Sequence, residues 1–268
     1  MTTKQLPPAL PVSAFVSRVA VVAAVLISFA APVQAQSDDA TAILKRMSDY
    51  VAAQKTLSVT FDTDTEVVTA DLEKIQFNSS GQVQLSRPDK LRATRLGGYA
   101  DVELVFDGKT LNVLSKDRNK FAQVDAPGSV DDLVETLRDK YMVVLPGADL
   151  VLARIFDEMS GDVVVAKNIG RGVIDGIECH HLAFRNLEVD WQIWIDAGVE
   201  PIPRKYVITS KSVQGSPQYT LRIKQWRTDV SPDAFVFKPP AGATKVAIEA
   251  LSGIDEVPPG SVATQGKK

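Results

Sequence analysis

The sequence is poor in the residues that most often build metal and nucleophile sites. It has one cysteine, Cys179, and two histidines, His180 and His181, which follow it directly. No disulfide can form within the chain, so its core alone must hold the fold. A zinc site needs three or four ligands, and no further cysteine or histidine can complete one here. Glu178–His181 therefore has two interpretations. It is either part of a metal site that aspartate or glutamate side chains from elsewhere complete, or a buried strand in which Cys179 acts as a small hydrophobic residue.

Catalytic motifs are also missing. The sequence has no Gly-x-Ser-x-Gly elbow. Gly170-Arg171-Gly172 lacks the third glycine of a dinucleotide-binding loop, and we interpret it as a hairpin turn. The two-residue period of a strand places Asp62 and Asp64 on the same face, which is more typical of a solvated surface than of an acid–base pair. We expect no enzyme activity, no cofactor and no metal; a hydrolase or metal enzyme centred on Glu178–His181 is the third-ranked alternative.

Long apolar runs are confined to the N-terminus. Residues 1–35 contain no acidic residue, and Lys4 and Arg18 make them positive. Val19–Ala31 is apolar except for one serine, and small residues lead up to Ala35. This order predicts a secretory signal peptide that is cleaved after Ala35. An uncleaved N-terminal anchor is the alternative, although the apolar stretch is shorter than the roughly 20 residues of a membrane span.

The chain that remains after cleavage is mildly acidic. Removal of Lys4 and Arg18 leaves 28 basic residues against 33 acidic ones, a net charge of −5. Nucleic acid and anionic lipid surfaces both attract basic proteins, so we expect neither as a partner. The next residue is Gln36, not a lipid-accepting cysteine, and no later segment is apolar for long enough to span a bilayer. We therefore expect an exported protein without stable membrane insertion after cleavage of the signal peptide.

Hydrophobic periodicity divides the chain into helical and extended parts. Residues 38–54 have helical spacing, and the period changes to two after Leu57, as in a half-buried strand. Helical patterns return only at residues 130–141, which Ser129 can cap, and at 148–159. Strand-like runs fill the rest: 59–65, 74–77, 81–85, 90–96, 102–106, 110–114, 120–124, 162–168, 177–184, 189–195, 204–210, 218–226 and 234–237.

Short breakers separate these runs. Ser79-Ser80-Gly81, Gly97-Gly98 and Asp107-Gly108 leave no room for parallel crossovers, so sequential strands must pair antiparallel. Two strand runs around a helical pair could form two domains, but no linker separates them. We therefore predict an α+β fold: one antiparallel sheet of about 11 strands, curled into a barrel or half-barrel, with helices over its concave apolar face. It should span residues 36–248, followed by a flexible tail at 249–268.

Three segments carry a family resemblance. Residues 85–92 contain Arg87-Pro88 between two strands, residues 104–111 contain an Asp-Gly-Lys-Thr hairpin, and residues 235–242 contain a Pro-Pro-x-Gly exit. Their order and spacing resemble the LolA/LolB-like superfamily of lipoprotein carriers, in particular an uncharacterised predicted periplasmic branch. The resemblance implies a periplasmic protein with an α+β half-barrel whose hydrophobic concavity is lidded by helices. It also implies that Arg87 hydrogen-bonds to the lid and helps to hold it closed.

The combined expectation is a carrier that shelters a lipid, an acyl chain or a lipoprotein under a helical lid. The alternative is a non-catalytic envelope scaffold or sensor that binds a partner protein, with the concavity filled by its own side chains. For the carrier we expect ten ligand-binding residues, one polar and nine apolar: Arg87, Phe61, Phe77, Leu85, Leu104, Phe106, Leu133, Leu137, Ile155 and Trp191.

Overall fold

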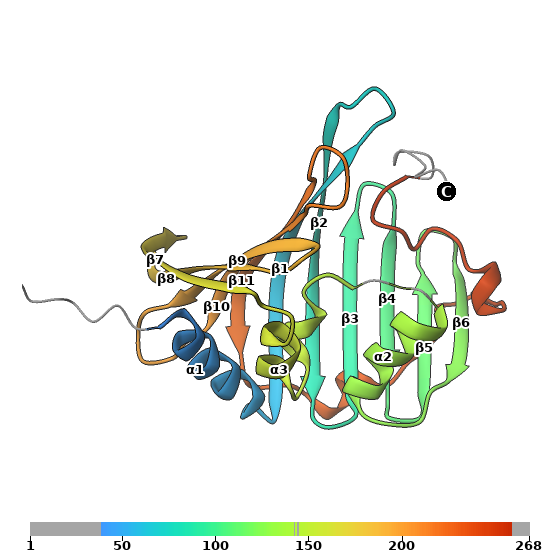
Figure 1. The fold of residues 1–268 in the computed structure, drawn as a ribbon. Helices are drawn as coiled ribbons and strands as arrows, with labels where there is room; N and C mark the ends of the chain where they lie inside the picture. The colour runs from blue at the N-terminus through green and yellow to red at the C-terminus, as the bar shows by residue number, and fades with distance from the viewer. Residues whose placement is uncertain (1–38, 142, 144, 259–268) are drawn as a thin grey trace, which may run out of the picture. The chain divides into compact units, whose positions relative to one another are not determined.

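The computed structural model describes residues 39–141, 143 and 145–258. The chain divides into two units, residues 1–36 and 37–268, and the fold below belongs to the second. The expected signal peptide lies outside the described residues. Within the described part, a 12-stranded sheet packs against three α-helices, and three short 3-10 helices lie in the connections (Figure 1).

The elements follow one another in the predicted order of one helix, a run of strands, a helical segment and a second run of strands. The helices are α1 Ala40–Ala52, α2 Val130–Tyr141, η1 Ala148–Val151, α3 Ile155–Ser160, η2 Pro232–Phe235 and η3 Ile248–Ala250. The strands are β1 Thr56–Val68, β2 Lys74–Ser86, β3 Lys90–Gly97, β4 Asp101–Phe106, β5 Thr110–Ser115, β6 Lys120–Asp125, β7 Val165–Ile174, β8 Ile177–Arg185, β9 Val189–Asp196, β10 Pro203–Ser210, β11 Gln218–Arg227 and β12 Thr244–Lys245.

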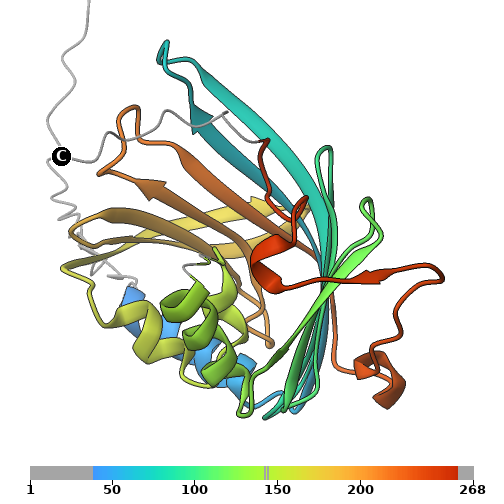
Figure 2. The same ribbon diagram turned by 90° about the vertical axis from the view of Figure 1, so that its right-hand side faces the viewer.

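Both strand runs belong to one sheet, as predicted. Its order is β12-β6-β5-β4-β3-β2-β1-β11-β10-β9-β8-β7, and β1 pairs antiparallel with β11 to join the two runs. Every pairing is antiparallel except that of the two-residue β12 with β6. Among the described residues β7 and β12 do not pair, so the sheet remains an unclosed half-barrel. Figure 2 shows the sheet curling around α1, α2 and α3.

Strand register determines which side chains face the helices. Val59, Val83, Ala93, Leu104 and Val113 are direct cross-strand partners on five successive strands, β1 to β5. Because side chains alternate along a strand, these five residues share the concave face and the residues next to them in sequence point to the other face. The hydrophobic core therefore lies between the concave face and the helices.

The β2 strand is longer than the sequence pattern indicates. Ser79-Ser80-Gly81 was predicted as a breaker, but the residues lie inside β2, paired with β1 and β3. Gly81 is opposite Phe61, and a Cβ atom there would overlap the Phe61 ring and the carbonyl oxygen of Thr94. Glycine is needed here for close packing inside a strand, and the turn prediction was wrong.

A second glycine prediction is wrong for a similar reason. Gly170-Arg171-Gly172 was interpreted as a turn but lies in β7, next to a register shift between Asn168 and Gly170. A Cβ atom on Gly172 would lie 2.8 Å from Trp194 Nε1, so the glycine leaves room for the indole. The hairpin turn is instead Asp175-Gly176, with φ angles of 49° and 82°, as two-residue hairpins require.

The helical interlude also differs in part from the expectation. The predicted helix at 130–141 is confirmed as α2. The one predicted at 148–159 is divided into η1 and α3, because Leu152 adopts an extended conformation between them, with φ −67° and ψ 161°.

The C-terminal part differs as well. The strand predicted at 234–237 is replaced by η2, which begins at Pro232 and lies against β3. A flexible tail was expected from residue 249, yet residues 249–258 pack on the domain and Leu251 is buried. The reason is visible in the spacing of Ile248, Leu251 and Ile254, which places an apolar residue at every third position.

Replacement of Gly81 should show how closely β1 and β2 pack. We expect Gly81→Ala to lower the free energy of unfolding by about 1–3 kcal/mol, because the new methyl group overlaps a ring and a backbone oxygen. Gly98→Ala is the matched control, since nothing lies within 4 Å of its Cβ position. Urea denaturation measures both. Equal stability of the two variants would contradict this account of Gly81.

Candidate functional site

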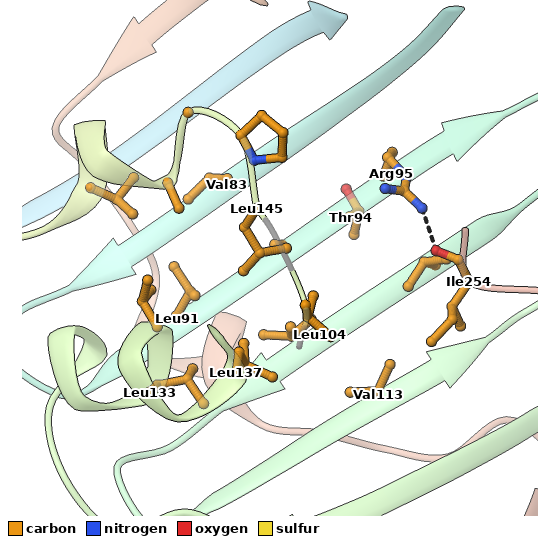
Figure 3. Close-up of a pocket in the computed structure, with 18 of the residues that line it drawn as sticks. Val83, Leu91, Thr94, Arg95, Leu104, Val113, Leu133, Leu137, Leu145 and Ile254 are labelled. Carbon is orange, nitrogen blue, oxygen red and sulfur yellow. Dashed lines mark hydrogen bonds between the residues drawn. The ribbon is translucent and has the colours of Figure 1, made fainter. Parts of the chain in front are cut away.

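A cavity of about 920 Å³ lies on the concave side of the sheet. Its walls come from β1 to β6 and β11, from α2, Val143 and residues 145–151, and from the C-terminal segment at 248–256. Figure 3 shows side chains from these parts converging on one space. The volume is in the range of small-molecule and lipid sites.

The floor of the cavity is a continuous apolar surface. Val83, Ala93, Leu104 and Val113 form a row across four neighbouring strands, and Leu91 lies beside it (Figure 3). Aliphatic side chains offer no hydrogen bonds, so water in this space would have few partners. The floor is thus suited to contact with hydrocarbon.

The cover over this floor is α2. Leu133, Val134 and Leu137 are buried on one face of the helix and line the cavity. Ser129 begins the helix, as predicted: its hydroxyl accepts a hydrogen bond from Asp132 N at 3.2 Å, while Ser129 N donates to the Asp132 carboxylate at 2.7 Å. Ser129 Oγ donates to the same carboxylate at 2.7 Å, and these two hydrogen bonds, from Ser129 N and Ser129 Oγ, hold the pKa of Asp132 below its ordinary value.

Two contacts attach the start of α2 to the rest of the domain. Val130 N donates to Pro88 O at 2.9 Å, which links the helix to the turn between β2 and β3. The Asp131 carboxylate accepts from Ala153 N at 3.0 and 3.1 Å, which links it to the segment before α3. The N-terminal end of the cover is therefore fixed in place over the sheet.

The cavity is polar on the side of the C-terminal segment. Arg95, on β3, forms an ion pair with Glu256 at 3.2 Å and donates a hydrogen bond to Ile254 O. Thr65 donates to the same carboxylate at 3.1 Å. Burial raises the pKa of the nearby Tyr219, and the charge of Glu256 raises it further. The cavity thus combines an apolar floor with one polar wall.

The ten residues expected to bind ligand fall into different places. Four line the cavity: Phe61, Leu104, Leu133 and Leu137. Four others, each at most 3% exposed, lie in the packed core: Leu85, Phe106, Ile155 and Trp191. Phe77 lies outside the cavity on the extended β1–β2 hairpin, where its ring contacts Tyr99 edge-on at 5.5 Å. Alternation finds the correct face but does not separate a cavity wall from solid packing.

Arg87 lies between the covering helices and away from the cavity. Its Nε donates to Gln54 O at 3.2 Å, at the C-terminal end of α1. Gln54 follows α1, which ends at Ala52, so among the described residues this hydrogen bond is not made to the covering α2; α2 interacts with Arg87 through the charge of Asp131. Burial lowers the pKa of the guanidinium, an effect that Asp131 opposes. Its Nη2 atom is buried and has no hydrogen-bond acceptor among the described residues.

Sequence reasoning missed the polar wall of the cavity. Arg95 follows Leu91 and Ala93 at the two-residue spacing of the concave face, so alternation alone could have placed it there. Glu256 could not be placed, because the segment that carries it was interpreted as a tail.

The Glu178–His181 segment is an ordinary part of the sheet. His181 stacks on Trp194 with ring centroids 4.1 Å apart and contacts Gln192 at 2.8 Å, while Cys179 is fully buried. Burial raises the pKa of this thiol. Among the described residues, no three histidine, cysteine, aspartate or glutamate side chains gather closely enough to hold a metal ion. In the same part of the chain, no helix has the length and apolar character to cross a bilayer.

Comparison with protein families gives one match. A family model described as "Predicted periplasmic protein (DUF2092)" matches residues 40–249, which is most of the described chain. This agrees with the resemblance to a predicted periplasmic branch. The search of curated proteins gives no match.

Several solved structures have a related fold at low identity. Lipoprotein LppX of Mycobacterium tuberculosis is 15% identical, with a TM-score of 0.45, over 72% of this chain and 97% of that one. A LolA superfamily protein of Nitrosomonas europaea is 13% identical, with a TM-score of 0.34, over 74% and 98%. The MucA/MucB complex of Pseudomonas aeruginosa is 13% identical, with a TM-score of 0.41, over 74% of this chain and 61% of the matched chain. Because these scores are low, we carry no ligand or partner over from them.

The buried thiol gives a direct test of this region. Thiolate is the reactive form of cysteine, so the raised pKa and full burial of Cys179 should make it unreactive in the folded protein. We expect a disulfide reagent at pH 8 to modify it at least about tenfold more slowly than in denaturing urea. Absorbance of the released thiol measures both rates. Equal rates would contradict the burial of Cys179.

Proposed function

This chain belongs to the family of predicted periplasmic proteins (DUF2092), and we propose that it binds and shelters the apolar part of a lipid or an acylated protein. The observation that carries the proposal is the cavity of about 920 Å³, with its aliphatic floor and the amphipathic cover of α2. The proposed role is binding or transport without catalysis.

The energetics favour a hydrocarbon occupant. Each methylene group that leaves water contributes about 0.8 kcal/mol, so a chain of ten methylenes gains about 8 kcal/mol before the costs of association. No catalytic group is needed for such binding. The row from Val83 to Val113 offers contact along the whole width of four strands.

The cavity also bears on the competing hypothesis of an envelope scaffold. That hypothesis expects the concave face to be filled by the protein's own side chains. Phe106, Ile155 and Trp191 do fill one part of it, but the space under α2 is not filled by described residues. This supports the carrier over the scaffold.

A bulky residue in the cavity floor should block binding. We expect Ala93→Trp to reduce uptake of a fluorescent fatty acid at least about tenfold, because the indole replaces the space that the chain would occupy. Gln84→Trp is the matched control: Gln84 lies on β2, next to the cavity-lining Val83 but on the opposite, polar face. Fluorescence titration measures affinity, and thermal unfolding shows that both variants fold.

Two outcomes would contradict the carrier. One is that the unmodified protein takes up no fluorescent fatty acid and carries no lipid in native mass spectrometry. The other is that Ala93→Trp and Gln84→Trp, both folded, bind the fatty acid as the unmodified protein does.

Export is the second part of the proposal. The signal sequence over residues 1–35 should be removed after Ala35, which leaves a diffusible protein without a lipid anchor. We expect N-terminal sequencing of protein from the periplasmic fraction to begin at Gln36. A chain that still begins at Met1 and sediments with membranes would indicate the uncleaved anchor instead.

A further inference from the structure

The wall of the cavity contains one partly buried cation. Arg95 and Lys140 are the positively charged residues that line it. Lys140 is exposed and lies over the Tyr141 ring at 5.3 Å. The Arg95 side chain is 22% exposed and projects from β3 on the same face as Ala93, two residues earlier. Its position is thus about 7 Å from the centre of the apolar floor.

Both polar contacts of Arg95 in the described part of the chain come from the C-terminal strap, which we define as residues 248–258. One is the backbone oxygen of Ile254 and the other is the Glu256 carboxylate (Figure 3 shows the first). Within the described residues, no strand of the sheet supplies a hydrogen-bond acceptor or a carboxylate to the Arg95 guanidinium.

The strap lies over the sheet through apolar side chains, with Ile248 and Ile254 packed against the core, and through a few hydrogen bonds. Leu251 is buried, Ser115 donates to Gly253 O at 3.2 Å, and Thr65 donates to Glu256. In the described chain these contacts come from a segment without regular structure after η3. If a ligand replaces the strap at these contacts, the strap moves and the strands of the sheet keep their pairing.

We propose that Arg95 is the headgroup site for an anionic amphiphile, and that Glu256 occupies this site until the carboxylate or phosphate of the ligand displaces it. The inference rests on the proposed function and names the chemical class of its ligand. The apolar tail lies along the floor under α2, and the anionic head pairs with Arg95.

The chemistry of the pair supports this assignment. A guanidinium presents donors in a planar fork that matches a carboxylate or a phosphate. Glu256 already places a carboxylate at this position, 3.2 Å from Arg95 Nη1, so the site accommodates such a group. Because the strap and the ligand compete for one cation, a weaker strap should give tighter binding.

The opposite face of β3 offers a matched control. Arg92 pairs with Glu103 at 2.6 Å and donates to Ala234 O, so it too has one carboxylate and one backbone partner. It lies three residues before Arg95 and does not line the cavity. Loss of this pair tests the general effect of removing an ion pair from the strand.

The experiment compares a fluorescent 16-carbon carboxylic acid with the corresponding alcohol, by titration of the full mature chain. We expect Arg95→Gln to weaken binding of the acid by about tenfold or more and to leave binding of the alcohol unchanged. Glu256→Gln should tighten binding of the acid several-fold, because the competing charge is gone. Arg92→Gln should change neither affinity.

Competition with inorganic phosphate separates an amphiphile site from a simple anion site. Millimolar phosphate should not displace the acid, and its displacement by phosphate alone would overturn the assignment to an amphiphile. Equal affinity for acid and alcohol in both the unmodified protein and Arg95→Gln would overturn the role of Arg95 and leave the proposed carrier intact. If neither probe binds to the unmodified protein, the carrier itself fails.

Discussion

The register between β1, β2 and β3 is the constraint on which the rest of the structure depends. Phe61 lies against Gly81, and this contact sets Val59 opposite Val83 and Val83 opposite Ala93. A shift of one residue would turn the cavity floor toward solvent and the polar convex side chains toward the helices. The cover, the floor and the position of Arg95 all follow from this register.

Local patterns in the sequence were enough to predict the architecture. The two-residue period identified the strands, and short breakers such as Asp107-Gly108 required antiparallel pairing. Glycines at 81 and 172 misled the prediction because they serve contacts between distant residues, Phe61 in one case and Trp194 in the other. Nothing in the neighbouring sequence distinguishes such a glycine from one in a turn.

The candidate site was predictable only in part. Leu104, Leu133 and Leu137 were found because an amphipathic helix and an alternating strand both indicate their buried face. Leu85 and Phe106 share that property and yet lie in packed core, since local spacing does not show where a curved sheet separates from its helices. The strap depends on a contact between residues 95 and 256, which lie far apart in the chain and become neighbours only after folding.

The two ends of the half-barrel sheet are protected in different ways. The β6 end is covered by a strand of only two residues, whereas β7 has ten residues and no described strand pairs with its outer side. Val165 and Val173 are exposed there, and Lys167 and Arg171 lie between them. Arg171 pairs with Glu178 on β8 at 3.5 Å, whereas the exposed Lys167 presents a charge that opposes strand-by-strand association with another copy. Because salt screens the repulsion between exposed charges, this edge is less protected at high ionic strength than at low.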